Sequence, residues 1–214
     1  MSSKKRSFDA VSEPVSDRVA TGLQKIGLAL RHQSVQKAGE DGISPTQGQI
    51  LAMLSAGAAT GTELAERLAV TLPTVSDSVK ALAAKGLVEK GPDPRHPRAT
   101  LLTLSDSGRK KARRAATWPD FLATAVSAMS AEEQEVFLVG LVKMIRSLQI
   151  DGRIPAQSMC VTCTHFRPNV RTGAEPHHCA FVDAPMAARH LRIVCDEHVP
   201  AAAPDDVWAR FVAG

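Results

Sequence analysis

The sequence predicts a mainly α-helical fold that carries one small β-hairpin and ends in a loop-rich appendage. Six Phe, two Trp and no Tyr leave few aromatic side chains for a β-sandwich or barrel, whereas alanine and leucine are abundant. Apolar residues recur at spacings of three and four through much of the first 150 residues. All four cysteines come after this helical part.

The size and charge of the chain narrow the classes of protein it can be. Its 214 residues suffice for one ordinary domain with an appendage, or for two small domains. Residues 1–150 hold 20 Lys and Arg against 15 Asp and Glu, and residues 151–214 hold 6 against 7. The basic surplus that attracts a polyanion therefore lies in the first part.

No stretch of the sequence predicts a membrane segment or a signal peptide. No apolar run reaches the ~18 residues of a membrane span, and Lys4-Lys5-Arg6 is not followed by an apolar stretch. We therefore expect a cytoplasmic protein without a membrane partner, whose thiols are kept reduced.

The first predicted elements are a flexible arm and a long helix. Residues 1–14 are polar and end in a proline, and residues 15–37 show helical periodicity before Gly39 and Gly42 end it. The apolar residues that recur at helical spacing are Val15, Val19, Leu23, Ile26 and Leu30.

Three shorter helices follow, and each has an N-terminal signal. Ser44 with Gln47 and Thr60 with Glu63 have the spacing of a capping box, and Pro73 suits the first turn of a helix. The predicted helices are 45–56, 61–68 and 73–85.

A hairpin comes next. Residues 87–90 and 99–104 are β-prone, and the loop 91–98 between them contains three prolines, two arginines and a histidine. A hairpin with a basic tip directly after a helix-turn-helix predicts a winged helix.

The helices after the hairpin predict a dimerisation region. Ser105 can cap a basic helix, and Trp118-Pro119 interrupts it. Ser130 with Glu133 forms another capping-box pattern, which opens a helix that ends near residue 151. Apolar residues cover more than one stripe of this last helix, so we expect it to pack against a partner subunit.

The helix 73–85 is the candidate for reading DNA in the major groove. Val75, Val79 and Leu82 would hold it on the core, which turns its short polar side chains outward. The wing arginines would lie on phosphates or in a narrow minor groove. The candidate DNA-contacting residues are Thr62, Thr74, Ser76, Asp77, Ser78, Lys80, Arg95 and Arg98. A protein-interaction module that does not bind DNA is the alternative.

The motifs in residues 45–114 resemble those of the MarR family of winged-helix regulators. The similarity lies in TELAERL at 62–68, TVS at 74–76, ALAAKGLV at 81–88, Asp93-Pro94, and LTLSDSGR at 102–109. The resemblance implies a homodimeric regulator of double-stranded DNA, in our interpretation a repressor, with two recognition helices about one DNA turn apart. Family wings usually carry an Asp followed by two Arg, whereas this chain has His96-Pro97-Arg98 and keeps only the last arginine.

The cysteine pattern predicts a metal centre. Cys160 and Cys163 form a C-x2-C pair, and Cys179 and Cys195 each follow after 15 residues. We favour a 4Fe–4S cluster, because the two-one-one layout resembles small high-potential 4Fe–4S proteins. Zinc is the alternative, with His198 as a replacement ligand. The residues His165, His177, His178 and His190 are expected at the surface or around the ligands.

The two centres imply different roles. Zinc would only fold the appendage, whereas a cluster would act as a redox or iron sensor. The predicted segments are a flexible arm (1–14), a winged-helix and dimerisation domain (15–152), a metal segment (153–198), and a linker with a short helix (199–214).

The sequence does not predict an enzyme. It has no glycine-rich phosphate loop and no His-Glu-x-x-His motif, and Cys160 with Cys163 lacks the strand–helix setting of a thiol oxidoreductase. The sequence leaves open whether a small-molecule effector binds.

Overall fold

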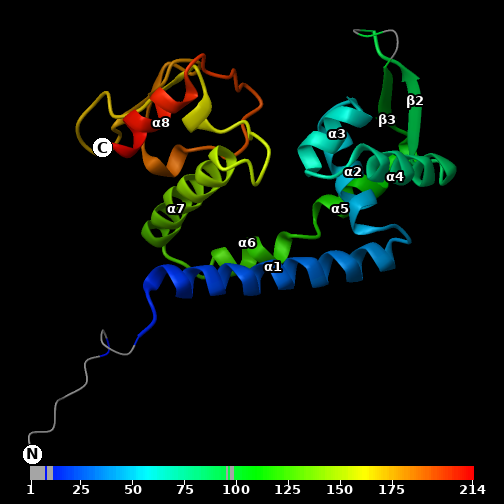
Figure 1. The fold of residues 1–214 in the computed structure, drawn as a ribbon, viewed down its shortest axis with the longest axis horizontal. Helices are drawn as coiled ribbons and strands as arrows, with labels where there is room; N and C mark the ends of the chain where they lie inside the picture. The colour runs from blue at the N-terminus through cyan, green and yellow to red at the C-terminus, as the bar shows by residue number, and fades with distance from the viewer. Residues whose placement is uncertain (1–7, 9–11, 95, 97–98) are drawn as a thin grey trace, which may run out of the picture. The chain divides into compact units, whose positions relative to one another are not determined.

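The computed structural model describes residues 8, 12–94, 96 and 99–214. The chain forms two compact units, Met1–Phe121 and Leu122–Gly214, which run from blue to green and from green to red in Figure 1. Each unit is described by itself.

Unit 1 has the predicted order of helices followed by a hairpin. Its sheet has the order β1-β3-β2, in which both neighbouring pairs are antiparallel. The sequence did not predict β1, because two residues are too few to show alternation. The elements are α1 (Val15–Glu40), α2 (Pro45–Ala56), β1 (Ala59–Thr60), α3 (Gly61–Leu68), α4 (Leu72–Ala84), β2 (Val88–Pro92), β3 (Thr100–Leu104) and α5 (Asp106–Ala116), and α6 (Asp120–Val126) follows.

The predicted capping boxes are confirmed. The Ser44 hydroxyl accepts from the Gln47 backbone N–H, and the Gln47 side chain accepts from the Ser44 N–H, both at 3.2 Å. Thr60 caps α3 in the same way with Glu63. Helix α4 begins one residue before the predicted start, because Thr71 supplies its cap.

The core of unit 1 lies between α2, α5 and the helix-turn-helix. Leu51, Leu64, Val75 and Leu82 are fully buried in it. The Trp118 ring packs on Gly48 so closely that a β-carbon at position 48 would lie 2.2 Å from the ring. Any larger residue at position 48 would therefore force this ring to shift.

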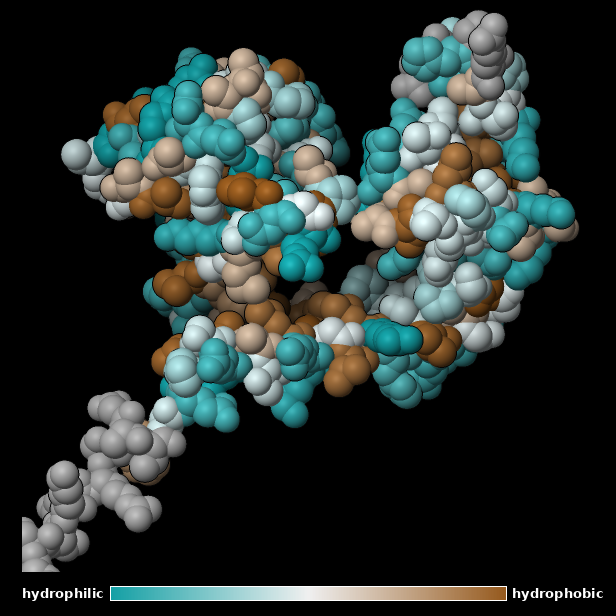
Figure 2. All heavy atoms as spheres, in the orientation of Figure 1, coloured by the Kyte–Doolittle hydropathy of each residue, from teal (hydrophilic) through white to brown (hydrophobic). Residues whose placement is uncertain are grey.

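The apolar stripe of the predicted first helix is not buried within the chain. Val15 is 66% exposed, Val19 49% and Ile26 41%, and Leu23 and Leu30 are half-buried. Periodicity identified the helix but could not tell what covers its apolar face. Hydrophobic residues, brown in Figure 2, are visible along α1.

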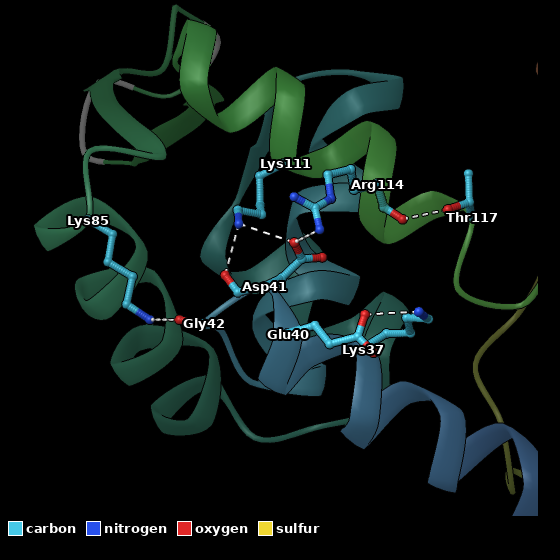
Figure 3. A network of polar contacts seen from close by, with 8 residues as sticks. All are labelled: Lys37, Glu40, Asp41, Gly42, Lys85, Lys111, Arg114 and Thr117. Atoms are coloured by element: carbon cyan, nitrogen blue, oxygen red, sulfur yellow. Dashed lines mark hydrogen bonds and ion pairs between the residues drawn. The ribbon is translucent and has the colours of Figure 1, made fainter.

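A buried carboxylate joins the end of α1 to α5 (Figure 3). The Asp41 side chain is 3% exposed and accepts from Lys111 Nζ at 3.2 Å and from Arg114 Nη2 at 2.8 Å. Lys111 Nζ also donates to the Asp41 carbonyl at 2.9 Å. Lys85, just after α4, donates to the Gly42 carbonyl at 2.7 Å, so this turn contacts both α4 and α5.

Unit 2 contains more regular structure than the loop-rich appendage that we expected. Three short strands form an antiparallel sheet of order β4-β5-β6. Strands of two or three residues leave no periodic signal, which is why the sequence did not predict them. The expected short C-terminal helix is α8. The elements are α7 (Ala131–Ile150), η2 (Cys160–Thr162), β4 (Phe166–Arg167), β5 (His177–Cys179), β6 (Ala184–Met186), η3 (Ala188–His190) and α8 (Pro204–Val212).

The core of unit 2 joins the cysteine segment to two helices. Met159 and Val161, on either side of Cys160, are buried together with Val142 of α7 and Phe211 of α8. An ion pair between the buried Arg146 of α7 and Asp205 also joins these two helices. The cysteine segment therefore folds as part of one core with α7 and α8.

Candidate functional site

Helix α4 presents a polar face on an apolar base. Val75, Val79 and Leu82 are at most 4% exposed, as predicted, and they fix the helix on the core. Four of the five predicted α4 contact residues are exposed, and Ser78 is half-buried. The exposed ones are Thr74, Ser76, Asp77 and Lys80.

The start of α4 is organised by Thr71. Its hydroxyl accepts from the Thr74 backbone N–H at 3.4 Å and lies 2.8 Å from the Thr74 hydroxyl. The Thr74 side chain therefore already has one partner within the helix cap. Thr62, in the first turn of α3, is exposed.

The junction between α4 and the hairpin is tightly packed. Gly86 ends α4 with a φ of +65°, and its carbonyl accepts from the hydroxyls of Ser105 and Ser107 at 2.6 and 2.8 Å. A β-carbon at Gly108 would lie 1.9 Å from the Leu87 carbonyl oxygen. These contacts fix the wing strands relative to α4. The sequence signal nearest to them is the motif LTLSDSGR at 102–109, which contains Ser105, Ser107 and Gly108.

The wing strands β2 and β3 have the predicted antiparallel pairing. At their open end the Asp93 N–H donates to the Ala99 carbonyl at 3.2 Å, and Asp93 is 2% exposed. Arg95 and Arg98, the predicted phosphate contacts, lie outside the described residues.

Unit 1 also contains a pocket between α1, α2 and the Trp118 region. It has a volume of about 620 Å³, and Leu30, Val35, Gly48 and Trp118 are among its lining residues. Pockets of roughly 300–1,000 Å³ accommodate small organic ligands.

In unit 2, all four cysteines line one cavity of about 410 Å³. Cys160 lies in η2, Cys163 directly after it, Cys179 in β5 and Cys195 in the loop before α8. Their thiols are free, Cys163 is buried and the other three are half-buried. The fold thus brings together four cysteines that span 36 residues of sequence.

Arg192 lies beside two of these sulfurs. Its backbone N–H donates to Cys160 Sγ at 3.2 Å, and its guanidinium Nη1 lies 3.7 Å from Cys195 Sγ. Burial raises the pKa of the Cys160 thiol, the Arg192 N–H lowers it, and the other three cysteines raise it further.

The histidines of this unit occupy different environments. His198 Nε2 lies 3.0 Å from the Thr162 hydroxyl, and burial lowers the pKa of the His198 ring. His177, expected at the surface or around the ligands, is instead a core residue: it is 5% exposed and packs against Phe166 and Phe211. His165 and His190 line the cysteine cavity.

His178 is half-buried, and its Nε2 lies 3.2 Å from a carboxylate oxygen of Asp183.

Among the described residues, no three or more Cys, His, Asp or Glu side chains are grouped so that they could hold a metal ion. Across all the residues that the structure describes, no helix is long and apolar enough to cross a membrane.

Comparison with known proteins shows that residues 41–99 match the MarR family. Staphylococcus aureus MepR in its DNA-binding conformation is 29% identical with a TM-score of 0.55, and the match covers 61% of this chain and 98% of MepR. The S. aureus MepR–DNA complex is 29% identical with a TM-score of 0.53, covering 60% and 97%. A MepR mutant from a multidrug-resistant S. aureus clinical isolate is 30% identical with a TM-score of 0.49, covering 61% and 97%. No curated protein sequence matches the chain.

Proposed function

Because the chain belongs to the MarR family of winged helix-turn-helix transcription regulators, which are not enzymes, we propose that it binds double-stranded DNA through α4. The observation that supports this most directly is the exposed polar face of α4 on its buried base of Val75, Val79 and Leu82. Side chains as short as Ser76 can approach base edges closely, and Lys80 can contact a phosphate. The related MepR has been crystallised with DNA, which adds weight to this proposal.

The regulator acts as a homodimer. Helix α1 exposes Val15, Val19 and Ile26, and α7 exposes Val136, which is 73% exposed. Apolar helix faces of this kind are usually covered by a partner. A two-fold dimer would present two α4 helices to one duplex and would repress transcription by occupying its site. The pocket beside Trp118 has room for a small-molecule effector.

The four cysteines of unit 2 bind a metal centre, a 4Fe–4S cluster or zinc, that regulates DNA binding as a redox or iron sensor. The shared core of the cysteine segment and α7 supports this, because a change at the sulfurs reaches α7 through contacts within unit 2.

Binding to duplexes selected from a random-sequence pool, followed by fluorescence anisotropy at several salt concentrations, tests the DNA-binding proposal. Lys80→Ala is expected to weaken binding to all sequences. It should also reduce the salt slope by about 0.9 for each lost phosphate contact, or roughly 2 for a dimer. Ser76→Ala is expected to change which base is preferred at one position of each half-site.

Lys25→Ala is the matched control, because Lys25 is also an exposed helical lysine but lies in α1. Equal effects of Lys80→Ala and Lys25→Ala would assign the binding to overall charge and not to α4. Failure to select any preferred sequence would leave the protein-interaction module as the function.

A further inference from the structure

The four cysteines of unit 2 line one cavity that is large for a single ion. The cavity volume of about 410 Å³ far exceeds the roughly 30 Å³ that one water molecule occupies in the liquid. A tetrahedral zinc needs all four sulfurs at about 2.3 Å from a single point. Within the described residues, however, no such ligand group is gathered around one position. A cubane of four iron and four sulfide ions is itself several ångströms wide, so its cysteines are held farther apart.

The walls of the cavity are suited to an iron–sulfur group. Phe166, Val182, Pro185 and Met186 line it with apolar side chains, of which those of Phe166 and Met186 are buried. The four thiols are the largest set of like ligands that these walls offer. The polar side chains that line the cavity beside the thiols are His165, His190, Arg192 and Glu197.

Arg192 provides the hydrogen bonds that cluster sulfurs commonly receive. Its N–H lies 3.2 Å from Cys160 Sγ, and its guanidinium lies 3.7 Å from Cys195 Sγ. One residue thus places a backbone donor and a positive charge beside two cysteines that are 35 positions apart. A cationic neighbour offsets the negative charge of a group held by four thiolates.

We infer that the cavity binds a 4Fe–4S cluster through Cys160, Cys163, Cys179 and Cys195, and that Arg192 positions and tunes it without being a ligand. This inference rests on the proposed metal centre and specifies its identity. His198 is not assigned as a ligand, because it does not line the cavity and its Nε2 lies 3.0 Å from the Thr162 hydroxyl.

The test is the metal content of the full chain, expressed with iron and purified without oxygen. Four irons and four acid-labile sulfides per chain, with the broad visible absorbance of a cluster, are expected. One zinc per chain, or neither metal, would overturn the inference. Cys195→Ser and Cys179→Ser should each lose the iron, whereas His198→Ala should keep it. The opposite pattern would refute the four-thiolate ligand set.

The role of Arg192 has a separate readout and a matched control. Arg192→Gln should shift the midpoint potential of the cluster to more negative values, because a positive charge stabilises the more negative, reduced form and its removal disfavours reduction. Arg189→Gln removes the same charge three residues earlier, where the side chain pairs with Glu175 at 3.4 Å and does not line the cavity. Equal potentials for the two variants would overturn the assignment of Arg192.

DNA binding measured on the same samples separates the two proposals. A protein that binds its selected duplex but contains zinc or no metal would refute the cluster alone. A protein that contains the cluster but does not bind any duplex would refute the regulator function alone.

Discussion

Replacement of Asp41 by alanine should destabilise unit 1 by about 2 kcal/mol. Hydrogen bonds to charged groups contribute roughly 1.5–3 kcal/mol each, and Asp41 accepts from Lys111 and Arg114. Two effects reduce the total. The Arg114 side chain is 65% exposed and can be hydrated after the change, and removing a carboxylate from a helix C-terminus regains about 0.3–1 kcal/mol.

Glu40→Ala is a closely matched control for this change. Glu40 is the preceding residue, carries the same charge and pairs with Lys37 at 2.9 Å, but both side chains are more than 40% exposed. Exposed pairs of this kind contribute about 0–1 kcal/mol. Both variants lose one negative charge, so the difference between their free energies of unfolding measures the effect of burying the carboxylate.

Tryptophan fluorescence during urea unfolding can follow unit 1 separately. Trp118 lies in unit 1 and Trp208 in unit 2, so a Trp208→Phe background leaves Trp118 as the reporter. With a urea m-value of about 1–3 kcal/mol/M, Asp41→Ala should lower the midpoint by roughly 1 M. If Glu40→Ala lowered the midpoint as much, the reasoning from burial would be wrong.

Three further predictions concern packing, assembly and metal removal. Gly108→Ala should destabilise unit 1 by at least about 1–3 kcal/mol, because its β-carbon would overlap a backbone carbonyl. Gly39→Ala, with open space around the β-carbon, should be neutral or stabilising in the same urea titration. Ile26→Glu should shift the dimer to monomer in sedimentation velocity, whereas Gln24→Glu on the same helix should not; a monomeric parent protein would contradict this. Chelation of the metal that we propose for unit 2 should lower the thermal midpoint reported by Trp208 more than that reported by Trp118, and unchanged midpoints would contradict a structural role of that proposed metal.

The sequence predicted those parts of the fold that depend on local signals. Capping residues such as Ser44 and Thr60 identified helix starts, and the β-prone residues 99–104 identified the wing strand β3. It could not predict the partners of Asp41, because the burial of that carboxylate depends on where α5 packs. It also could not predict the strands of unit 2, whose pairing depends on contacts between residues distant in sequence.

The candidate sites show the same division. The helical spacing of Val75 and Val79 predicted which side of α4 is exposed. A helix with one buried apolar face turns its remaining residues to solvent. The spacing of the cysteines predicted a shared site but not its size, because Cys179 and Cys195 are placed by the sheet and by the loop beside Arg192.

The position of α7 gives unit 2 a physical route from the cysteines to an exposed surface. Val142 packs in the core that contains Met159 and Cys163, and Gln149 donates to the Met159 sulfur at 3.5 Å. Val136 and Leu148 of the same helix are exposed. Because packed cores tolerate little rearrangement, a change at Cys163 that moves Met159 must displace α7 or leave a cavity beside it. The same displacement of α7 moves the exposed Val136 and Leu148. If these residues contact the partner subunit, as proposed, a change at the cysteines would alter the stability of the dimer.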